Sequence, residues 1–249
     1  MYSGLLSNVD QLRELIAKAP ASGKSPDILF SKAFDVLQQL GAKYVTYSHA
    51  APLGASDFNR PVFLATHGLP EHWKFEYIDR RYFECDPISR AGLSATFPFQ
   101  WHDVEQMLEL TKRDRMYLRR LREEKLSSGV CVPTFGPRGR NGYFGIGFGE
   151  ETMSFETIEF LQTYNFCQNV HLIYCEMIQE ISPSDKSLSY REKSVLRLVL
   201  EGNNNKKISE ALDISVHSVA TYLVRAHEKL GTNERFSAAT RAMALGMLD

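Results

Sequence analysis

Residues 188–230, LSYREKSVLRLVLEGNNNKKISEALDISVHSVATYLVRAHEKL, decide the fold of the C-terminal part of this chain. The pattern predicts three short amphipathic helices separated by polar turns, which is the arrangement of a helix-turn-helix. Ser189 and Glu192 form a capping box at the start of the first helix, and Gly202 follows its last apolar residues. The second helix is predicted at about 206–212, and Ser215 can cap the third.

The third helix has one apolar face and one face free for contact with DNA. The apolar face carries Val219, Leu223 and Leu230 at helical spacing. The opposite face carries His217, Ala220, Thr221, Val224, Arg225 and Glu228. A helix that packs on one side and exposes the other can enter a major groove. The sequence therefore predicts a DNA-reading domain over residues 188–249, preceded by a linker at 182–187.

Charge and composition limit what the chain can do. Residues 188–249 hold nine Lys or Arg and seven Asp or Glu, so this module has a net charge of +2 although the whole chain has −1. A weakly basic module predicts weak binding to DNA as a monomer, and we expect dimerisation to raise the affinity. The four cysteines show no CxxC pair and no zinc-like spacing, so we expect neither a metal nor a cofactor. No leader and no membrane-length apolar run is recognised, and we expect a soluble, cytoplasmic protein without a membrane partner.

Residues 1–181 are enough for a second domain with its own core. Helices are predicted at about 9–19, 26–40, 70–77, after Asp86-Pro87, from Asp103 to about Lys125, and at about 155–181. Strands are predicted at about 43–48, 61–66, 97–101, 129–135 and 142–149. This order predicts an α+β protein, in which an α/β/α sandwich surrounds an antiparallel sheet and an all-α helix-turn-helix domain follows. Such a sandwich can hold a small molecule between the sheet and one helical layer.

A set of aromatic, acidic and glycine residues carries a resemblance to a known family. Trp73, Tyr77, Asp86-Pro87, Trp101 and Gly129 occur in the order and approximate spacing of a pocket motif. Together with the C-terminal module, they make the chain resemble LuxR-type quorum-sensing transcription factors, which are N-acyl-homoserine-lactone receptors joined to a helix-turn-helix. The module alone is less specific, because many response regulators carry a similar one. Its resemblance rests on Glu192, Leu196, Gly202, Ile208, Val219, Leu223, Lys229 and Leu230.

The resemblance implies ligand-binding roles, and the chemistry of the side chains suits them. The indole N–H of Trp73 is only a donor, which fits a lactone carbonyl, and a carboxylate at Asp86 fits an amide N–H. Tyr77 is implied as a pocket wall or donor, and Trp101 as an apolar face against the lactone. Taken singly, each has a structural alternative, as a core aromatic or a helix-capping Asp. Further candidates for the pocket wall are Tyr117, Leu118, Leu121 and Leu126.

Three positions depart from the family pattern. Leu69 stands where relatives often place a tyrosine that bonds the amide carbonyl, and Ile88 where some carry a threonine. Gly145 stands where a serine is common. Each departure replaces a polar partner by an apolar or absent side chain. The partner of the ligand's amide carbonyl is therefore left open, although all three positions stay candidates for the pocket.

Residues 142–148, GYFGIGF, bear on the tail of the ligand. By the two-residue period of a strand, Tyr143, Gly145 and Gly147 share one face. If that face lines the pocket, the missing side chains leave room for a long or bulky tail. The glycines would serve strand twisting or close packing equally well, so both interpretations stay open.

The predicted DNA-reading face departs from the family as well. Ala220 and Val224 stand where relatives often read bases with arginine or lysine, and neither can make a bidentate contact to guanine. The candidate DNA contacts are Lys206, Lys207, His217, Ser218, Thr221, Arg225 and Lys229. For any one of the lysines or arginines, a solvated surface charge is an equally good explanation.

We expect a mechanism in which the ligand controls folding or dimerisation, and the homodimer then binds palindromic promoter DNA. The helix at 155–181 and the terminal helix at 236–248 are candidate dimer surfaces, although complete burial in the core would explain the apolar residues of the 155–181 helix equally well. RNA polymerase is a candidate partner. A response regulator is disfavoured because residues 43–66 lack an acidic pair after an early strand. A lactone or amide hydrolase is disfavoured because no GxSxG elbow and no HxHxDH-like run occurs. An orphan receptor, independent of ligand or tuned to another small molecule, remains an alternative.

Overall fold

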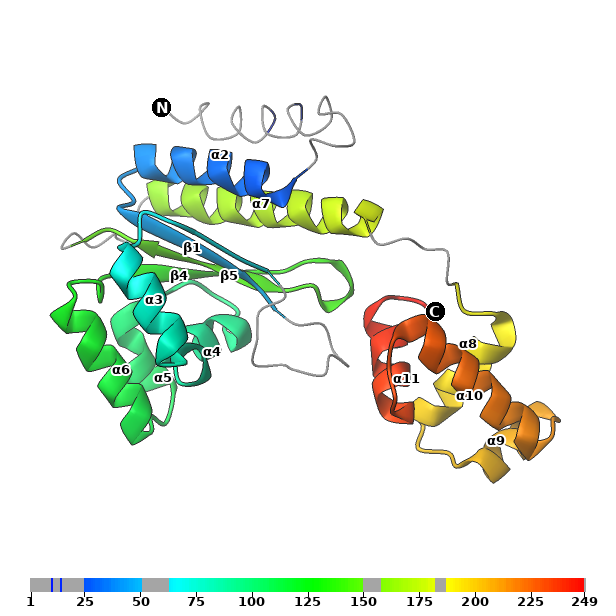
Figure 1. Ribbon diagram of the computed structural model, residues 1–249. Coiled ribbons are helices and arrows are strands. Elements are labelled where there is room, and N and C mark those ends of the chain that lie inside the picture. Colours follow the sequence, from blue (N-terminus) through cyan, green and yellow to red (C-terminus); the bar gives the residue numbers. More distant parts are fainter. Residues whose placement is uncertain are drawn as a thin grey trace. The chain divides into compact units, whose positions relative to one another are not determined.

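A five-stranded antiparallel sheet organises the N-terminal part of the protein (Figure 1). A computed structural model describes residues 25–50, 63–149, 158–181 and 187–248, together with the isolated positions Asp10 and Glu14. The chain divides into two compact units. The larger contains the sheet with helices α2 to α7, and the smaller contains helices α8 to α11. The predicted α+β architecture, with its sandwich and its helical C-terminal domain, is confirmed.

The strands are arranged in the order β2-β1-β5-β4-β3, and each neighbouring pair is antiparallel. They are β1 (Tyr44–His49), β2 (Phe63–His67), β3 (Phe99–Gln100), β4 (Gly129–Thr134) and β5 (Gly142–Gly147). Because side chains alternate along a strand, Val45 and Tyr47 of β1 belong to one face and Thr46 to the other. Each face packs against its own layer of helices, which produces two separate apolar cores.

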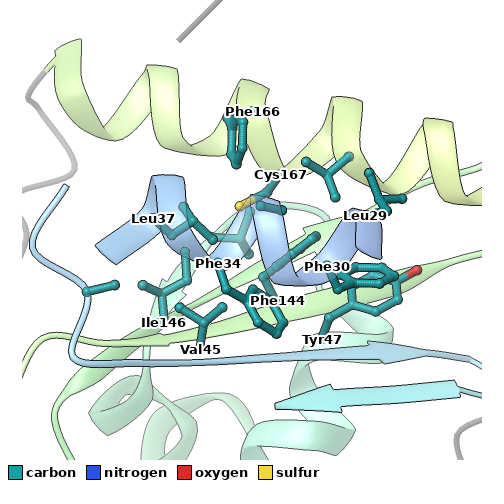
Figure 2. Close-up of a cluster of buried hydrophobic side chains, with 14 of the residues drawn as sticks. Leu29, Phe30, Phe34, Leu37, Val45, Tyr47, Phe144, Ile146, Phe166 and Cys167 are labelled. Atoms are coloured by element: carbon teal, nitrogen blue, oxygen red, sulfur yellow. The ribbon is translucent and has the colours of Figure 1, made fainter. Parts of the chain in front are cut away.

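Two long helices cover the first face (Figure 2). Helix α2 (Pro26–Gln39) begins as predicted at Ser25, whose hydroxyl accepts the Asp27 N–H at 3.2 Å, and Gly41 follows the helix with φ +96°. Helix α7 (Ile158–Ile181) lies beside it. Both helices pack on sheet residues such as Val45, Phe144 and Ile146.

This apolar core contains a buried polar cluster. The Tyr47 hydroxyl lies 2.8 Å from His171 Nδ1, and His171 Nε2 lies 2.8 Å from the Arg140 carbonyl. A carbonyl only accepts, so His171 donates through Nε2 and accepts the Tyr47 hydroxyl at Nδ1. His49 Nδ1 is 3.4 Å from the same hydroxyl, and the Cys175 thiol is 3.5 Å from His171 Nε2. Burial lowers the pKa of both His49 and His171 to about 4, so both rings are neutral at pH 7.

Shorter helices cover the second face of the sheet. They are α3 (Glu71–Asp79), α4 (Pro87–Ser94), α5 (Val104–Met107) and α6 (Lys112–Glu123), with short 3-10 turns at Tyr82–Glu84 and Trp101–Asp103. Two ion pairs tie this layer together, because α6 pairs through Arg120 with Glu76 of α3 at 2.9 Å and through Asp114 with Arg90 of α4 at 2.7 Å.

One predicted helix of this layer is wrong. Instead of one long helix from Asp103 to Lys125, the chain forms α5 and α6 with an extended residue, Leu108, at the end of α5. Asp103 accepts the Gln100 N–H at 2.9 Å and does not cap α5, whereas Thr111 and Asp114 form a capping box at the start of α6. The Thr111-x-x-Asp114 spacing was the available signal for this second start.

The C-terminal unit closely follows its sequence pattern. Helix α8 (Tyr190–Leu200) begins at the predicted Ser189–Glu192 capping box, α9 (Asn205–Leu212) at Asn204, and α10 (Val216–Leu230) at Ser215. Gly202 and Gly231 follow α8 and α10 with positive φ. Helix α11 (Arg235–Ala244) is shorter than the predicted 236–248. These helices enclose their own core.

The predicted helix at 9–19, apart from Asp10 and Glu14, and most of the predicted linker at 182–187 lie outside the described residues. The strand predicted at 97–101 is reduced to Phe99–Gln100. In the part of the chain that is described, no helix combines the length and the apolar character needed to cross a membrane.

Candidate ligand-binding and DNA-binding sites

A cavity of about 250 Å³ lies between the second face of the sheet and the layer formed by α3, α4 and α6. Its walls are mainly apolar and aromatic, with a few polar groups, which is the usual make-up of a small-molecule site. The sequence-predicted residues that line it are Leu69, Trp73, Tyr77, Asp86, Ile88, Trp101, Tyr117, Leu121, Leu126 and Gly145. Leu118 does not line the cavity and is buried in the adjoining core.

Asp86 is held by both the backbone and the side chains around it. Its Oδ1 accepts the N–H groups of Ile88 at 2.9 Å and Ser89 at 3.2 Å, which caps α4. Its Oδ2 accepts the Tyr77 hydroxyl at 3.0 Å. Burial raises the pKa of Asp86, while these donors and the Tyr117 hydroxyl act in the opposite direction. Asp86 therefore combines the helix-capping alternative with a place in the cavity wall.

An aromatic cluster holds the α3 side of the cavity. The ring of Trp73 stacks on Tyr82 at 5.7 Å between centroids and lies 6.1 Å from the ring of Tyr117. Tyr77 meets both tyrosines edge-on at 6.2 Å. Because Trp73 and Tyr77 are one helical turn apart on α3, the same face of the helix brings both side chains to the cavity.

Trp101 lies against the sheet, where glycine makes room for its ring. A Cβ added at Gly129 would lie 2.8 Å from the Trp101 ring, and one added at Gly145 would lie 3.5 Å from it. Trp101 is 8 % exposed, and its buried indole N–H finds no hydrogen-bond partner among the described residues. Trp101 therefore lines the cavity, and its buried indole N–H is a donor that no described residue uses.

The other glycines of the cavity face are closely packed. An added Cβ at Gly147 would overlap the ring of Tyr44, and one at Gly145 would lie 2.6 Å from Thr46 Oγ1. Tyr143, Gly145 and Gly147 share this face, as the period-two pattern predicts. At Gly147 the close-packing interpretation applies, because the ring of Tyr44 fills the space that the missing side chain leaves.

Sequence reasoning missed much of the floor of the cavity. The cavity is also lined by Tyr44, Thr46, Ser48, Leu64, Thr66, Lys74 and Ile78. Tyr143 lines it too, on the strand face that the alternation assigns to Gly145. The alternation of β1 contained the signal, but the strand pairing that sets β1 beside β5 is not visible in the sequence. Within the described residues, no three His, Cys, Asp or Glu side chains converge as a metal site.

The candidate DNA-binding surface lies on α9 and α10. His217, Ala220, Val224 and Arg225 are exposed on α10, and Val224 is 55 % exposed. Ser218 and Thr221 are partly buried, and their hydroxyls bond within the helix, to Ser215 Oγ at 2.8 Å and to the His217 carbonyl at 3.0 Å. Lys206 and Lys207 are exposed on the first turn of α9.

Lys229 differs from the other candidate DNA contacts. Its Nζ lies 2.7 Å from Glu192 Oε2 and 3.0 Å from the Ser187 carbonyl. Glu192 is only 2 % exposed, and although burial raises its pKa, Lys229 and Ser189 together hold that pKa below its ordinary value. This geometry gives Lys229 a structural role as the partner of a buried carboxylate.

Two family models match this chain, one in each unit. Residues 25–168 match the model of the autoinducer binding domain, and residues 186–242 match that of the bacterial regulatory proteins of the luxR family. The chain belongs to the LuxR family. Members of this family are transcriptional regulators and not enzymes, and their autoinducer binding domain implies a small-molecule ligand.

Curated relatives of this LuxR-family protein include the transcriptional activators AnoR and LuxR. AnoR of Acinetobacter nosocomialis is 24% identical over 229 residues, which cover 90% of this chain and 94% of AnoR. LuxR of Aliivibrio fischeri is 24% identical over 187 residues, which cover 72% of this chain and 73% of LuxR.

Solved structures share the fold of this chain. The crystal structure of Escherichia coli SdiA matches with a TM-score of 0.71 and 18% identity, covering 98% of this chain and 99% of SdiA. The structure of SdiA in complex with octanoyl-rac-glycerol matches with a TM-score of 0.70 and 17% identity, covering 97% of this chain and 95% of that one.

Proposed function

We propose that this protein is an N-acyl-homoserine-lactone receptor that regulates transcription by binding promoter DNA. The observation that carries the proposal is the convergence of Trp73, Tyr77, Asp86 and Trp101 on one cavity. Trp73 donates to the lactone carbonyl, Asp86 accepts the amide N–H, and Trp101 packs on the lactone ring. Tyr77 holds the Asp86 carboxylate in place through its 3.0 Å hydrogen bond.

The ligand has a tail longer than four carbons. The support for this is the apolar wall formed by Leu64, Leu69, Ile88, Leu121 and Leu126, which would bury a chain of several methylene groups. Each buried methylene contributes about 0.8 kcal/mol, so a longer tail binds more tightly as long as the wall accommodates it. The ligand stabilises the receptor unit by mass action, because the unfolded chain has no pocket to bind it.

The regulator acts as a homodimer on a palindromic site in the cytoplasm, where its DNA is found. Two copies of α10 in the dimer contact two half-sites about one helical turn apart. Base and phosphate contacts come from Lys206, Lys207, His217, Ser218, Thr221 and Arg225, and Ala220 and Val224 contact thymine methyl groups. Contact with RNA polymerase would convert promoter binding into regulation.

Melting of the full-length protein against a panel of ligands tests this function. The panel contains N-acyl-homoserine lactones from butanoyl to dodecanoyl, together with octanoyl-rac-glycerol, which lacks both the amide and the lactone. We expect the largest rise in melting temperature with a lactone longer than butanoyl, and loss of most of that rise in Asp86→Asn. A response to octanoyl-rac-glycerol alone would contradict the lactone assignment and favour a receptor tuned to another molecule. Absence of any response would favour a ligand-independent regulator.

A further inference from the structure

The exposed face of α10 carries two parallel rows of side chains. Residues four apart on a helix lie one above the other, so they form such rows. One row is apolar and consists of Val216, Ala220 and Val224, all of them exposed, with Val216 at 48 % and Val224 at 55 %. The neighbouring row is polar and consists of His217, Thr221 and Arg225. The helix therefore presents an apolar edge beside a polar edge to whatever it meets.

The hydroxyl beside the apolar row is already engaged within the helix. Thr221 Oγ1 donates to the His217 carbonyl at 3.0 Å. A hydroxyl has one proton, so Thr221 has no second proton to donate to a base. In these two rows, the side-chain donors that remain for a base contact are those of His217 and Arg225. Hydrogen bonds alone therefore give this face a limited means of telling base pairs apart.

Cations identify DNA as the partner of this surface. Lys206 and Lys207 are exposed on the first turn of α9, which packs with α10 in one core. Arg225 is exposed in the polar row itself. Positive side chains around a helix face complement the phosphates on either side of a major groove.

The bases of a major groove offer an apolar row one matching group. Each base pair presents hydrogen-bond donors and acceptors there, and thymine adds an apolar group, its C5 methyl. Valine and alanine cannot pair with donors or acceptors, and covering those groups without a partner costs free energy. Contact with a methyl group is favourable instead, because apolar surface on both sides is removed from water. The apolar row therefore favours thymine at the base pairs that it meets.

The length of the row sets how many base pairs it can meet. Val216 and Val224 are eight residues apart, which corresponds to about 12 Å along the helix axis. Base pairs follow one another at about 3.4 Å, so the row spans about three to four of them. Its next position is Glu228, which is exposed and negatively charged and therefore disfavours a close approach to phosphates. The contact is thus confined to the turns of α10 before Glu228.

We propose that Val216, Ala220 and Val224 together determine the base preference of the promoter site by contact with the C5 methyl groups of pyrimidines. Each half-site then contains thymines at adjacent base pairs over about three to four positions. A cytosine that carries a C5 methyl can replace a thymine in this contact, so the regulator responds to cytosine methylation of its site. The inference rests on the proposed binding to promoter DNA, but not on the identity of the small-molecule ligand.

Substitutions in the DNA test the contact with methyl groups. Duplexes are selected from a randomised pool with the full-length protein, together with the lactone that most raises its melting temperature, or without ligand if none does. Replacement of thymine by uracil in the preferred duplex removes only the C5 methyl. Affinity should fall about threefold to fourfold at each contacted position and stay unchanged at thymines outside the half-sites. At a contacted position, 5-methylcytosine should bind about threefold to fourfold more tightly than cytosine.

Substitutions in the protein assign the effect to the apolar row. Val216→Ala and Val224→Ala shorten side chains that are about half exposed, and alanine favours a helix more than valine, so both variants should melt like the wild type. Each should reduce the uracil penalty at its own thymine to less than about twofold, which is the coupling expected of groups in contact. Arg225→Ala is the matched control from the neighbouring row. It should weaken binding to the thymine and uracil duplexes by the same factor.

Four results would each overturn the inference while DNA binding stands. They are a preferred duplex in which uracil binds as well as thymine everywhere, equal affinity for cytosine and 5-methylcytosine, a uracil penalty unchanged in both valine variants, and a penalty that Arg225→Ala reduces as strongly as they do. Failure to select any duplex would instead contradict the proposed binding to DNA.

Discussion

The Tyr77 hydroxyl donates a hydrogen bond of 3.0 Å to Oδ2 of Asp86, while Oδ1 of the same carboxylate caps helix α4. One side chain thus joins α3 to α4 at the wall of the cavity. A substitution at position 86 can change both the stability of the fold and the binding of a ligand, and the choice of substitution separates the two effects.

Asp86→Asn should impair binding while largely sparing the fold. Asparagine caps helices about as well as aspartate, and its amide group can donate to the Tyr77 oxygen. The charged acceptor is lost, so affinity for the best lactone of the panel should fall by about 1.5–3 kcal/mol, which corresponds to roughly 10-fold to 160-fold. Asp86→Ala should lose about 1 kcal/mol of stability in addition, because the cap of α4 is removed. Melting of the ligand-free variants measures the stability effect, and an equal loss in both would contradict the capping argument.

Trp73→Phe should separate stacking from hydrogen bonding. Phenylalanine retains an aromatic ring against Tyr82 but has no N–H to donate. We expect an affinity loss of about 1 kcal/mol for a lactone, and a smaller loss for the homocysteine thiolactone with the same acyl chain, whose carbonyl is a poorer acceptor. Equal losses for the two ligands would argue that Trp73 acts only through packing.

The buried histidines should make the receptor unit sensitive to acid. The pKa of His49 and His171 is about 4 in the folded protein, against 6.5 ordinarily, chiefly because burial disfavours the charged rings. Arg140 lowers the pKa of His49 further, whereas the hydrogen bond to the Arg140 carbonyl acts in the opposite direction on His171. Between pH 6.5 and 4 the unfolded chain binds protons that the folded chain resists, so the free energy of unfolding should decrease as the pH falls through this window. Above pH 6.5 the two histidines should contribute no slope.

Denaturant unfolding followed by tyrosine and tryptophan fluorescence at a series of pH values measures this effect. His171→Gln, which keeps a donor toward the Arg140 carbonyl, should reduce the slope between pH 4 and 6.5. An unchanged slope in this variant would assign the acid sensitivity to other groups.

Two lysines of the C-terminal unit should behave in opposite ways. Lys229→Met leaves the buried Glu192 carboxylate without its 2.7 Å partner, and should destabilise the unit by about 3 kcal/mol. Replacement of the exposed Lys206 by alanine should leave the stability unchanged. The same replacement should reduce the slope of log affinity for DNA against log salt concentration by about one, because one phosphate contact is lost. Melting of the C-terminal helices and a salt titration of DNA affinity distinguish the two. Equal stability of both variants would contradict the structural role of Lys229.

Arg225→Ala should weaken DNA binding without loss of stability. Arg225 is exposed on α10, so its removal leaves no cavity and no unpaired buried charge. We expect a loss of roughly 1–3 kcal/mol in affinity for the promoter site. The same variant measured on unrelated DNA tells a base contact from a phosphate contact, because only the phosphate contact weakens binding to both equally.

Local signals in the sequence predicted most of the elements correctly. Ser25-Pro26, Asp86-Pro87 and Ser215 each begin a helix as their capping chemistry predicts. The prediction of one long helix from Asp103 is wrong, because the apolar residues before and after Leu108 resemble those of a continuous helix. The Thr111–Asp114 capping box marks the start of a second helix. Patterns that act within a few residues, such as helix caps, therefore predict where helices begin when every capping motif in a segment is considered.

Contacts between distant segments could not be predicted in this way. Tyr44 fills the space beside Gly147, and Thr46 faces Gly145, only because β1 pairs with β5 across about a hundred residues of chain. The sequence suggested that Lys229 contacts phosphate. Its hydrogen bond to Glu192 could not be predicted, because that contact depends on the packing of α8 against α10. The family motif therefore predicted cavity residues such as Trp73 and Asp86, whereas cavity residues that are placed by strand pairing, such as Tyr44 and Thr46, were not predicted.

Asp86 both caps α4 and lines the cavity, and this combination affects how such sequences evolve and how they should be interpreted. A receptor that had lost its signal molecule would still be under selection to keep a carboxylate or amide at the start of α4, because folding alone requires the cap. The indole N–H of Trp73 caps no helix, and a smaller aromatic ring could preserve its stacking on Tyr82. When homologous genes are surveyed for those that still sense lactones, drift at position 73 should therefore reveal a lost signal earlier than drift at position 86.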